Sequence, residues 1–132
     1  PQVVERFHRG ENPFTVYGYD QTRAFCHIDD AVRSVVQAME TPNACTQTYH
    51  IGDDRDEITI ETLVRHIGEV AGFNGTYEKG SSHTGSVSRR CPDVSRAREV
   101  FGYEPRVHWE EGVRETVEWY LDYFREEREV FE

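Results

Sequence analysis

Hydrophobic positions along the chain repeat mainly at helical spacing. Over residues 60–71 the apolar side chains recur every three or four positions, as on one face of an amphipathic helix. Thr59 precedes this run as a predicted N-cap, and Gly72 follows it as a stop. The same reasoning predicts the end of a helix over residues 1–10, a helix from Asp29 or Asp30 to about Met39, a short helix capped by Asp93, and a final helix over about residues 110–125.

Short runs of β-type residues lie between these helices. Residues 14–17, 25–28 and 48–51 are strand candidates, and residues 105–108 are expected to be extended. Residues 81–88 are small and polar, which predicts a loop. No strand, GxGxxG turn and helix occur in succession, so no dinucleotide-binding unit is expected within these residues. We predict an α+β fold of about five helices with several short strands, in a single domain.

Composition adds a strong excess of acidic residues. The 132 residues carry 25 Asp and Glu against 15 Lys and Arg, a formal net charge of −10, and Lys79 is the only lysine. This charge argues against non-specific binding to nucleic acid, which needs a basic surface. Abundant carboxylates with almost no lysine favour a halophilic source, because a salt-rich cytoplasm screens the repulsion between them. The alternative is an ordinary acidic protein from a genome of high GC content.

Cysteines and histidines give no sign of a metal site. Cys26, Cys45 and Cys91 are too widely spaced for a disulfide scaffold or a zinc motif, so we expect reduced thiols in a cytoplasmic protein. The 6 histidines form no HExxH motif, and no metal is predicted. No apolar run reaches the roughly 20 residues that a membrane-spanning helix needs.

Four segments of the chain carry motifs. The first is VYGYDQTRAFCHIDD over residues 16–30. The second is RRCPD over residues 89–93, followed by SRA and FGYEP. The third is YHIG over residues 49–52 followed by ITI, and the fourth joins EEGV over residues 110–113 to a later WY.

In their order along the chain and in their spacing, the four segments resemble those of extended short-chain dehydrogenase-like enzymes that act on nucleotide sugars. The family patterns are VYG…QxRxFxxVxD, YNIG, RxxDxSKA…LGWxP and a final EGL…WY. The variant QTRAF is most similar to UDP-glucuronate decarboxylases, and related epimerases and dehydratases come close. The resemblance covers nearly the whole chain, and its strength lies in the combination rather than in any one motif.

The resemblance implies a C-terminal substrate-binding domain over residues 1–132, with the dinucleotide-binding Rossmann half absent. Residues 1–10 would then be the tail of a helix from that preceding half. The resemblance also implies that the complete enzyme uses NAD as its cofactor, that this chain alone binds none, and that the enzyme forms a homodimer through the missing half. Its ligand would be a UDP-, dTDP- or GDP-sugar. Epimerisation, dehydration and decarboxylation stay open, as do a stand-alone binding module without catalysis and a role in assembly.

Two arginines are the main candidates for ligand binding. In the family, arginines that match Arg23 and Arg90 bind the diphosphate from two sides, and Arg89 is an alternative to Arg90. A guanidinium suits this role because its planar fork of donors matches phosphate oxygens. The structural alternative is that each arginine pairs with an aspartate of its own segment.

A second group of candidates would contact the nucleotide base. Thr15, Val16 and Tyr17 match the family strand whose backbone groups contact the base, and Tyr17 is a candidate to stack on it. The alternative is a buried tyrosine in an edge strand. His27, farther along, is more simply interpreted as a core or surface residue.

The catalytic pair of the family has no counterpart here. Family members use a Tyr-x-x-x-Lys pair, in which the tyrosine is the general base and the lysine lowers its pKa. The residue four positions before Lys79 is Gly75, so no such pair exists in this chain. We therefore predict no catalytic residue in the chain and expect it to be inactive alone, although the parent enzyme would be an isomerase or a lyase.

Overall fold

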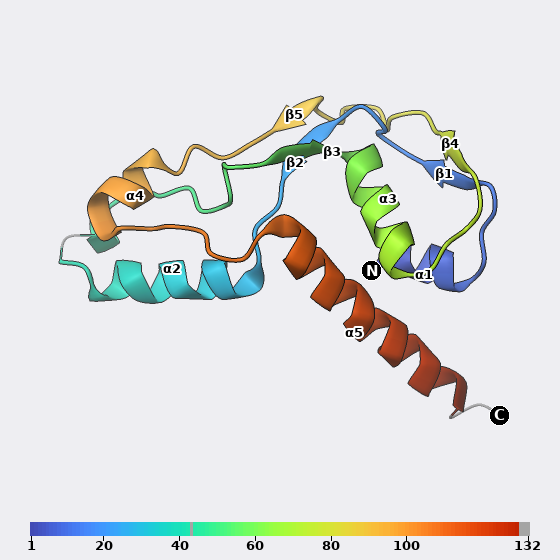
Figure 1. Ribbon diagram of the computed structural model, residues 1–132. Helices are drawn as coiled ribbons and strands as arrows, with labels where there is room; N and C mark the ends of the chain where they lie inside the picture. Colours follow the sequence, from blue (N-terminus) through green and yellow to red (C-terminus); the bar gives the residue numbers. More distant parts are fainter. Residues whose placement is uncertain (43, 130–132) are drawn as a thin grey trace. The chain divides into compact units, whose positions relative to one another are not determined.

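The computed structural model describes residues 1–42 and 44–129, and their contacts divide the chain into two compact units. Unit 1 contains residues 1–21 and 59–88 and the chain from residue 113 onward. Unit 2 contains residues 22–58 and 89–112. Figure 1 shows the elements of both units in their order along the chain.

Unit 1 is built from one pair of parallel strands and three helices. Strand β1 pairs with β4 so that Phe14 lies opposite Tyr77 and Val16 opposite Lys79. The long helix α5 begins in unit 2 and continues in unit 1. The elements are α1 (Gln2–His8), β1 (Phe14–Val16), α3 (Ile60–Val70), β4 (Tyr77–Lys79) and α5 (Trp109–Glu129).

Aromatic packing dominates the core of unit 1. The rings of Phe7 and Phe14 stack with their centroids 4.0 Å apart, and the rings of Phe73 and Tyr77 pack around them. Offset and edge-on contacts of this kind stabilise a core beyond simple area burial. The other buried members of this core are Val4, Val16, Val64, Ile67 and Val117.

Helix α3 agrees closely with the prediction from sequence. The Thr62 N–H donates to the Thr59 hydroxyl oxygen over 3.0 Å, which confirms Thr59 as the N-cap. The helix is followed by Gly72, whose φ of +72° lies in the left-handed region that favours glycine.

Unit 2 contains a three-stranded sheet in the order β3-β2-β5. Strand β2 lies in the centre and runs parallel to β5. A separate small core of the unit consists of Val94, Ala97 and Tyr103, with Tyr49, Ile51 and Phe101 packed against it. The elements are β2 (Thr22–Ala24), α2 (Ile28–Glu40), a 3₁₀ turn η1 (Ala44–Thr46), β3 (Glu57–Thr59), β5 (Arg89–Arg90) and α4 (Ser95–Phe101).

Helix α2 begins earlier than predicted. His27 is its N-cap, since the Asp29 N–H donates to His27 Nδ1 over 3.4 Å, so the prediction that Asp29 or Asp30 caps the helix was wrong. Both aspartates lie in the first turn, where a negative charge suits the helix dipole. The carboxylate of Asp30 is fully buried and accepts the N–H groups of Arg106 and Val107, each over 3.0 Å.

The strands were predicted less well than the helices. Residues 48–51 form no strand, and the strand expected over residues 25–28 lies earlier, at Thr22–Ala24. Residues 105–108, expected to be extended, lie in no helix. Strands β3, β4 and β5 were not predicted. The N-cap position of helix α4 is Val94 rather than Asp93, although the Asp93 carboxylate accepts the N–H of the first helical residue, Ser95, over 3.0 Å. The α+β class is confirmed, with five α-helices and short strands among the residues that the structure describes.

Candidate functional site

The pairing of β2 with β5 brings the predicted arginines together. Arg23 lies opposite Arg90 in the parallel register, and Thr22 lies opposite Arg89. Side chains of register partners project from the same face of a sheet, and successive residues project from opposite faces. Arg23 and Arg90 therefore share one face of the pair, and Arg89 belongs to the other.

Glu57 on β3 holds Arg89 in place. Its carboxylate accepts Arg89 Nε over 2.9 Å and the Thr22 hydroxyl, and Arg89 Nη2 lies 2.8 Å from the same carboxylate. The hydrogen bond from Thr22, followed by that from Arg89, lowers the pKa of Glu57, and the Glu57 contact raises the pKa of Arg89. Arg89 is thus engaged by a carboxylate, which distinguishes it from Arg90.

The other two arginines have different surroundings. Arg23 is partly buried, and its Nη1 donates to the carbonyl oxygen of Thr22 over 2.6 Å. Arg90 is exposed, and it forms no ion pair with a carboxylate in the described part of the chain. Asp93, the predicted structural partner of Arg90, instead accepts the hydroxyl of Ser95 over 2.6 Å.

Both Arg23 and Arg90 line an open depression of about 550 Å³ in unit 2. Its volume lies within the range of roughly 300–1,000 Å³ that is typical of small-molecule sites. Two guanidinium groups at one depression favour an anionic ligand with more than one charge. The remaining lining residues are Ala24, Cys26, Tyr49, His50, Ile51, Gly52, Cys91 and Pro92.

The backbone of Gly52 is fixed by packing from two directions. The buried Tyr103 hydroxyl donates to its carbonyl oxygen over 2.9 Å. A Cβ added at Gly52 would lie 2.4 Å from Pro92 Cγ, so only glycine permits this close approach. The thiol of Cys26 lies 3.6 Å from the Tyr103 hydroxyl, and burial raises the pKa of this thiol. The YHIG segment therefore forms a well-supported wall of the depression.

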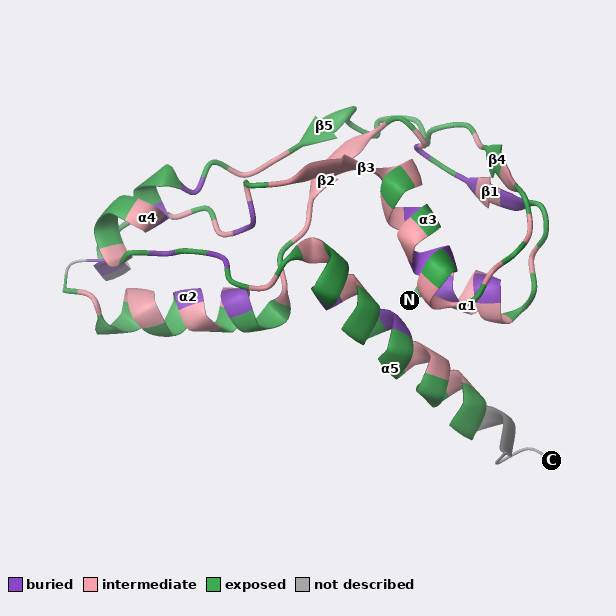
Figure 2. Cartoon of the chain, in the orientation of Figure 1, coloured by how far each residue is buried: buried purple, intermediate pink, exposed green. Residues whose placement is uncertain are grey.

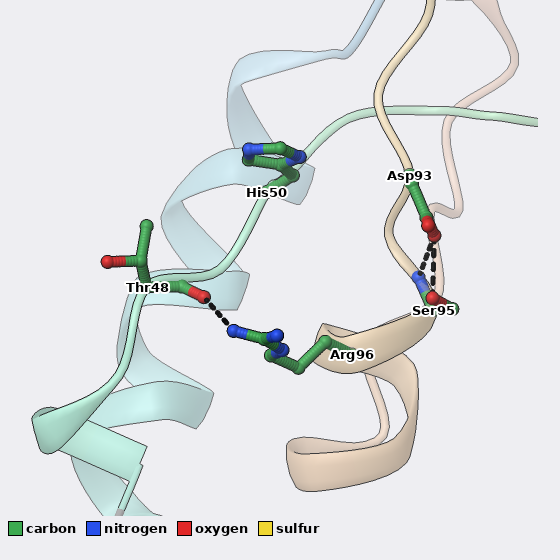
Figure 3. A pocket seen from close by; sticks show the side chains of 5 residues that line it. All are labelled: Thr48, His50, Asp93, Ser95 and Arg96. Atoms are coloured by element: carbon green, nitrogen blue, oxygen red, sulfur yellow. Dashed lines mark hydrogen bonds between the residues drawn. The ribbon is translucent and has the colours of Figure 1, made fainter.

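A second depression of about 310 Å³ lies in the same unit. Figure 3 shows that Arg96 reaches the carbonyl oxygen of Thr48, over 3.3 Å, and that Asp93 accepts two hydrogen bonds from Ser95. The hydrogen bond from the Ser95 hydroxyl, followed by that from the Ser95 N–H, lowers the pKa of Asp93. His50 lines both depressions.

The candidates for base contact belong to unit 1, whereas the three arginines belong to unit 2. The carbonyl oxygen of Thr15 accepts Arg6 Nη2 over 2.8 Å, and that of Val16 accepts the Gly80 N–H over 2.9 Å. The side chain of Val16 is buried in the core of the unit. Both carbonyl groups thus already accept one hydrogen bond from the protein.

Tyr17 presents its ring at the surface of unit 1. Its side chain is 49% exposed, which does not agree with the alternative of a buried edge-strand tyrosine. The ring stacks on His83 with centroids 5.8 Å apart, and the Arg6 guanidinium lies 5.6 Å from its centre. Tyr17 therefore offers an aromatic face beside a positive charge.

Comparison with known proteins shows to which family the chain is related. A sequence model of the GDP-mannose 4,6-dehydratase family matches residues 1–116. The chain belongs to the GDP-mannose 4,6-dehydratase family. The expected relationship to extended short-chain dehydrogenase-like, NAD-dependent nucleotide-sugar epimerases and dehydratases is thereby confirmed.

Relatives of this family member include several enzyme types. UDP-glucuronic acid decarboxylase 1 of Xenopus tropicalis is 32% identical, over 87% of this chain and 26% of its own length. The structure of UDP-glucose 4-epimerase from Thermotoga maritima with UDP-glucose has a TM-score of 0.81 and 30% identity, over 93% of this chain and 39% of its own. The structure of dTDP-glucose 4,6-dehydratase from Streptomyces venezuelae, with NAD and TYD bound, has a TM-score of 0.77 and 25% identity. This match covers 92% of this chain and 38% of that one.

This family member matches only part of its relatives. The chain spans 40% or less of the length of the first curated relatives that it matches. Its described residues contain no glycine-rich turn between a strand and a helix, so they do not fit NAD. Lys79, the only lysine, is paired with Asp20.

A metal site and a membrane-spanning helix are both absent from the residues that the structure describes. No group of three or more His, Cys, Asp or Glu side chains is arranged to hold a metal ion in the part of the family member that the structure describes. No described helix combines the length and the apolar character that crossing a bilayer requires.

Reasoning from sequence missed part of the site. His50, Asp93 and Arg96 line the second depression, and Cys26 and Cys91 line the first. All five lie within or beside the motifs that matched the family, but the motifs alone gave no reason to place them around a cavity.

Proposed function

We propose that this chain is the nucleotide-sugar-binding part of an NAD-dependent epimerase or dehydratase, and that Arg23 and Arg90 bind the diphosphate of the ligand. The observation that carries the proposal is their pairing in register at the edge of one depression. Each guanidinium can present two parallel N–H donors to phosphate oxygens, and two such groups side by side match two phosphates.

The rest of the site supports this arrangement. Glu57 engages Arg89 on the opposite face of the pair, which fixes β5 beside the central strand. The wall that includes Gly52 and Pro92 gives the depression an apolar side against which a sugar or nucleoside ring can pack. For the base itself we propose Tyr17, with Thr15 and Val16, on the strength of the family resemblance and the exposed Tyr17 ring.

The chain's own part in the reaction is then binding and orientation. In the proposed enzyme, NAD supplies the oxidation and reduction of the sugar, and a Tyr-x-x-x-Lys pair outside these residues moves the proton. Holding a diphosphate at two points limits the motion of the attached sugar and so favours a reactive geometry. We propose that the 132-residue chain alone catalyses no turnover. We further propose a cytoplasmic location and a dimer formed by the complete enzyme.

Calorimetric titration of the chain with UDP, dTDP and GDP tests the binding role. Arg23→Gln and Arg90→Gln should each weaken binding by about tenfold to a hundredfold, because a charge-assisted hydrogen bond contributes roughly 1.5–3 kcal/mol. Arg9→Gln removes the same charge from a 72%-exposed position on unit 1 and should leave the affinity unchanged. Equal affinities for the wild type and both site variants would exclude the proposal.

UDP-glucuronate decarboxylation is a second, more specific candidate. It is favoured by the QTRAF segment around Arg23, which is most similar to decarboxylases of this type. Titration with UDP-glucuronate and UDP-glucose tests it, since a decarboxylase part should prefer the first. A stand-alone binding module would bind the same ligands, and the size of the native protein in its source cells distinguishes it from an enzyme part.

A further inference from the structure

The ring of Tyr17 lies close to residues from several parts of unit 1, and one of them is a histidine. The imidazole of His83 stacks on the ring with centroids 5.8 Å apart and planes 24° from parallel. The guanidinium of Arg6 lies 5.6 Å from the ring centre. A Cβ added at Gly80 would lie 2.8 Å from Tyr17 Cδ1, so only glycine permits this approach to the ring. All four residues belong to unit 1.

The backbone that leads into Tyr17 is held in place by two of these residues. Arg6 donates Nη2 to the carbonyl oxygen of Thr15 over 2.8 Å. The Gly80 N–H donates to the carbonyl oxygen of Val16 over 2.9 Å. The ring of Tyr17 is therefore carried by a strand that two separate segments of unit 1 support, and it forms a fixed surface for stacking.

His83 lies on a segment that is exposed to solvent. Residues 81–88 are all exposed, and Figure 2 shows most of the chain between β4 and β5 in the colour of exposed residues. The carbonyl oxygen of His83 accepts the Ser86 N–H over 3.1 Å, and the Ser86 hydroxyl donates to Gln21 Oε1 over 2.9 Å. The turn that carries His83 is thus tied to the segment just after Tyr17, which holds the imidazole against the ring.

The rings of Tyr17 and His83 overlap only in part. Touching carbon atoms lie roughly 3.5–4.0 Å apart, so centroids that are 5.8 Å apart belong to rings displaced sideways from each other. The imidazole covers one edge of the Tyr17 ring, in agreement with the 49% exposure of this side chain. The uncovered part is smaller than a whole phenol face, and His83 borders it.

We propose that His83 sets the base preference of the nucleotide-sugar site. It forms one wall of a subsite on Tyr17 that accepts a pyrimidine, uracil or thymine, and disfavours guanine. This inference rests on the proposed function, which leaves UDP-, dTDP- and GDP-sugars open. A pyrimidine is a single six-membered ring, which can stack on Tyr17 next to the imidazole. Guanine has a second, fused ring that would reach the place of the imidazole, so the stack of His83 on Tyr17 would have to open.

Calorimetric titrations of the chain with UDP, dTDP and GDP test this role. His83→Ala removes the imidazole from an exposed turn. His83→Phe keeps a flat ring at the same position, and Thr84→Ala changes the next residue of the same turn as the matched control. Circular dichroism establishes that each variant is folded before its affinities are compared.

The wild type should bind UDP and dTDP more tightly than GDP by about twofold to tenfold, the factor that one aromatic stack contributes. His83→Ala should remove this preference, because guanine no longer has to displace a ring, whereas His83→Phe and Thr84→Ala should keep it. A wild type that binds GDP as tightly as UDP, or a preference that His83→Ala leaves unchanged, would overturn the inference. So would loss of the preference in Thr84→Ala, because the turn rather than the imidazole would then set it.

Titrations of Arg23→Gln and Arg90→Gln separate this inference from the proposed function. Binding that depends on both arginines, with a base preference that does not depend on His83, would overturn the inference alone. A preference that depends on His83, in a chain whose affinity does not depend on either arginine, would exclude the diphosphate site but leave the base subsite. Absence of any nucleotide binding by the folded wild type would overturn both.

Discussion

The hydroxyl of Tyr103 donates a hydrogen bond of 2.9 Å to the carbonyl oxygen of Gly52. Tyr103 is fully buried, and burial, followed by its contact with Cys26, raises the pKa of its hydroxyl, so this group stays a donor at all physiological pH values. Gly52 in turn lines the depression that contains Arg23 and Arg90. One buried phenol therefore supports the backbone of the candidate site.

Replacement of Tyr103 by phenylalanine should destabilise unit 2. The change keeps the ring but leaves the buried carbonyl of Gly52 without its donor, which costs about 1–3 kcal/mol of unfolding free energy. Urea denaturation followed by circular dichroism measures this loss. Tyr120→Phe on α5 is the control and should change the unfolding free energy much less. An unchanged denaturation midpoint for Tyr103→Phe would show that the bond contributes nothing.

Gly52→Ala should disturb the depression by steric conflict. The new methyl group would lie 2.4 Å from Pro92 Cγ, and overpacking of this kind typically costs about 1–3 kcal/mol. We expect lower stability and weaker binding of UDP, measured by thermal denaturation and calorimetry. The double variant Gly52→Ala with Pro92→Ala removes the clashing atom and should recover part of both. Absence of any recovery would mean that another contact causes the defect.

The carboxylate of Asp30 should make the stability of the protein sensitive to acid. Burial alone raises its pKa, but the N–H bonds from Val107 and Arg106, with Arg33, outweigh burial and hold the pKa below the ordinary value of 3.8. Because the folded pKa is lower than the unfolded one, the stabilisation is present above pH 3.8 and is lost as the pH falls toward the folded pKa.

Asp30→Asn tests this role. It should lower the unfolding free energy at pH 7 by about 3 kcal/mol, since it leaves the buried donors without a charged acceptor. The difference from the wild type should shrink as the pH falls below 4, as the wild-type carboxylate also becomes neutral. Asp29→Asn, at a neighbouring side chain that is 76% exposed, should have little effect. A difference that stays constant from pH 7 to pH 3 would contradict the assignment.

Cys91 should report ligand binding through its chemical reactivity. It lines the same depression as Arg90, so a bound diphosphate should shield it from alkylation. Cys26 lines the depression too and is exposed, so a bound ligand should shield it as well, although the raised pKa of its thiol slows its reaction. Peptide mass spectrometry after brief treatment with N-ethylmaleimide, with and without UDP, follows each thiol separately. Equal rates for Cys91 in both conditions would place the ligand elsewhere.

The acidic composition predicts a dependence of stability on salt. With a net charge of −10, the folded chain should gain stability as salt screens the repulsion between carboxylates. We expect the melting temperature to rise in molar potassium chloride relative to dilute buffer. A melting temperature that is no higher in molar salt would exclude the hypothesis of a halophilic source.

Helices were easier to predict from this sequence than strands. Helix α3 has a regular apolar face and a threonine cap. Both features are visible in the local sequence and are present in the folded protein. Strand β5 consists of Arg89 and Arg90, and β4 includes Glu78 and Lys79, so neither shows the apolar alternation that marks a strand. These strands exist because of partners far away in the sequence, which local patterns do not reveal.

The candidate site was likewise only partly predictable from local sequence. Family motifs singled out Arg23 and Arg90, but their placement in one register depends on the pairing of two distant segments. His27 shows the limit of reading caps from residue type alone. Asp29 and Asp30 follow it and were the expected caps, yet the His27 imidazole is the N-cap. The buried Asp30 instead accepts hydrogen bonds from the chain after α4.

The interleaving of the two units has a consequence for how the chain tolerates cleavage. Unit 2 is made of residues 22–58 and 89–112, and on both sides of each segment the chain continues into unit 1. A single internal nick between the units would leave the arginine-bearing unit tethered by the remaining connections. Neither unit can be cloned as one uninterrupted stretch of sequence, so any separate expression of unit 2 needs a new linker between its two segments.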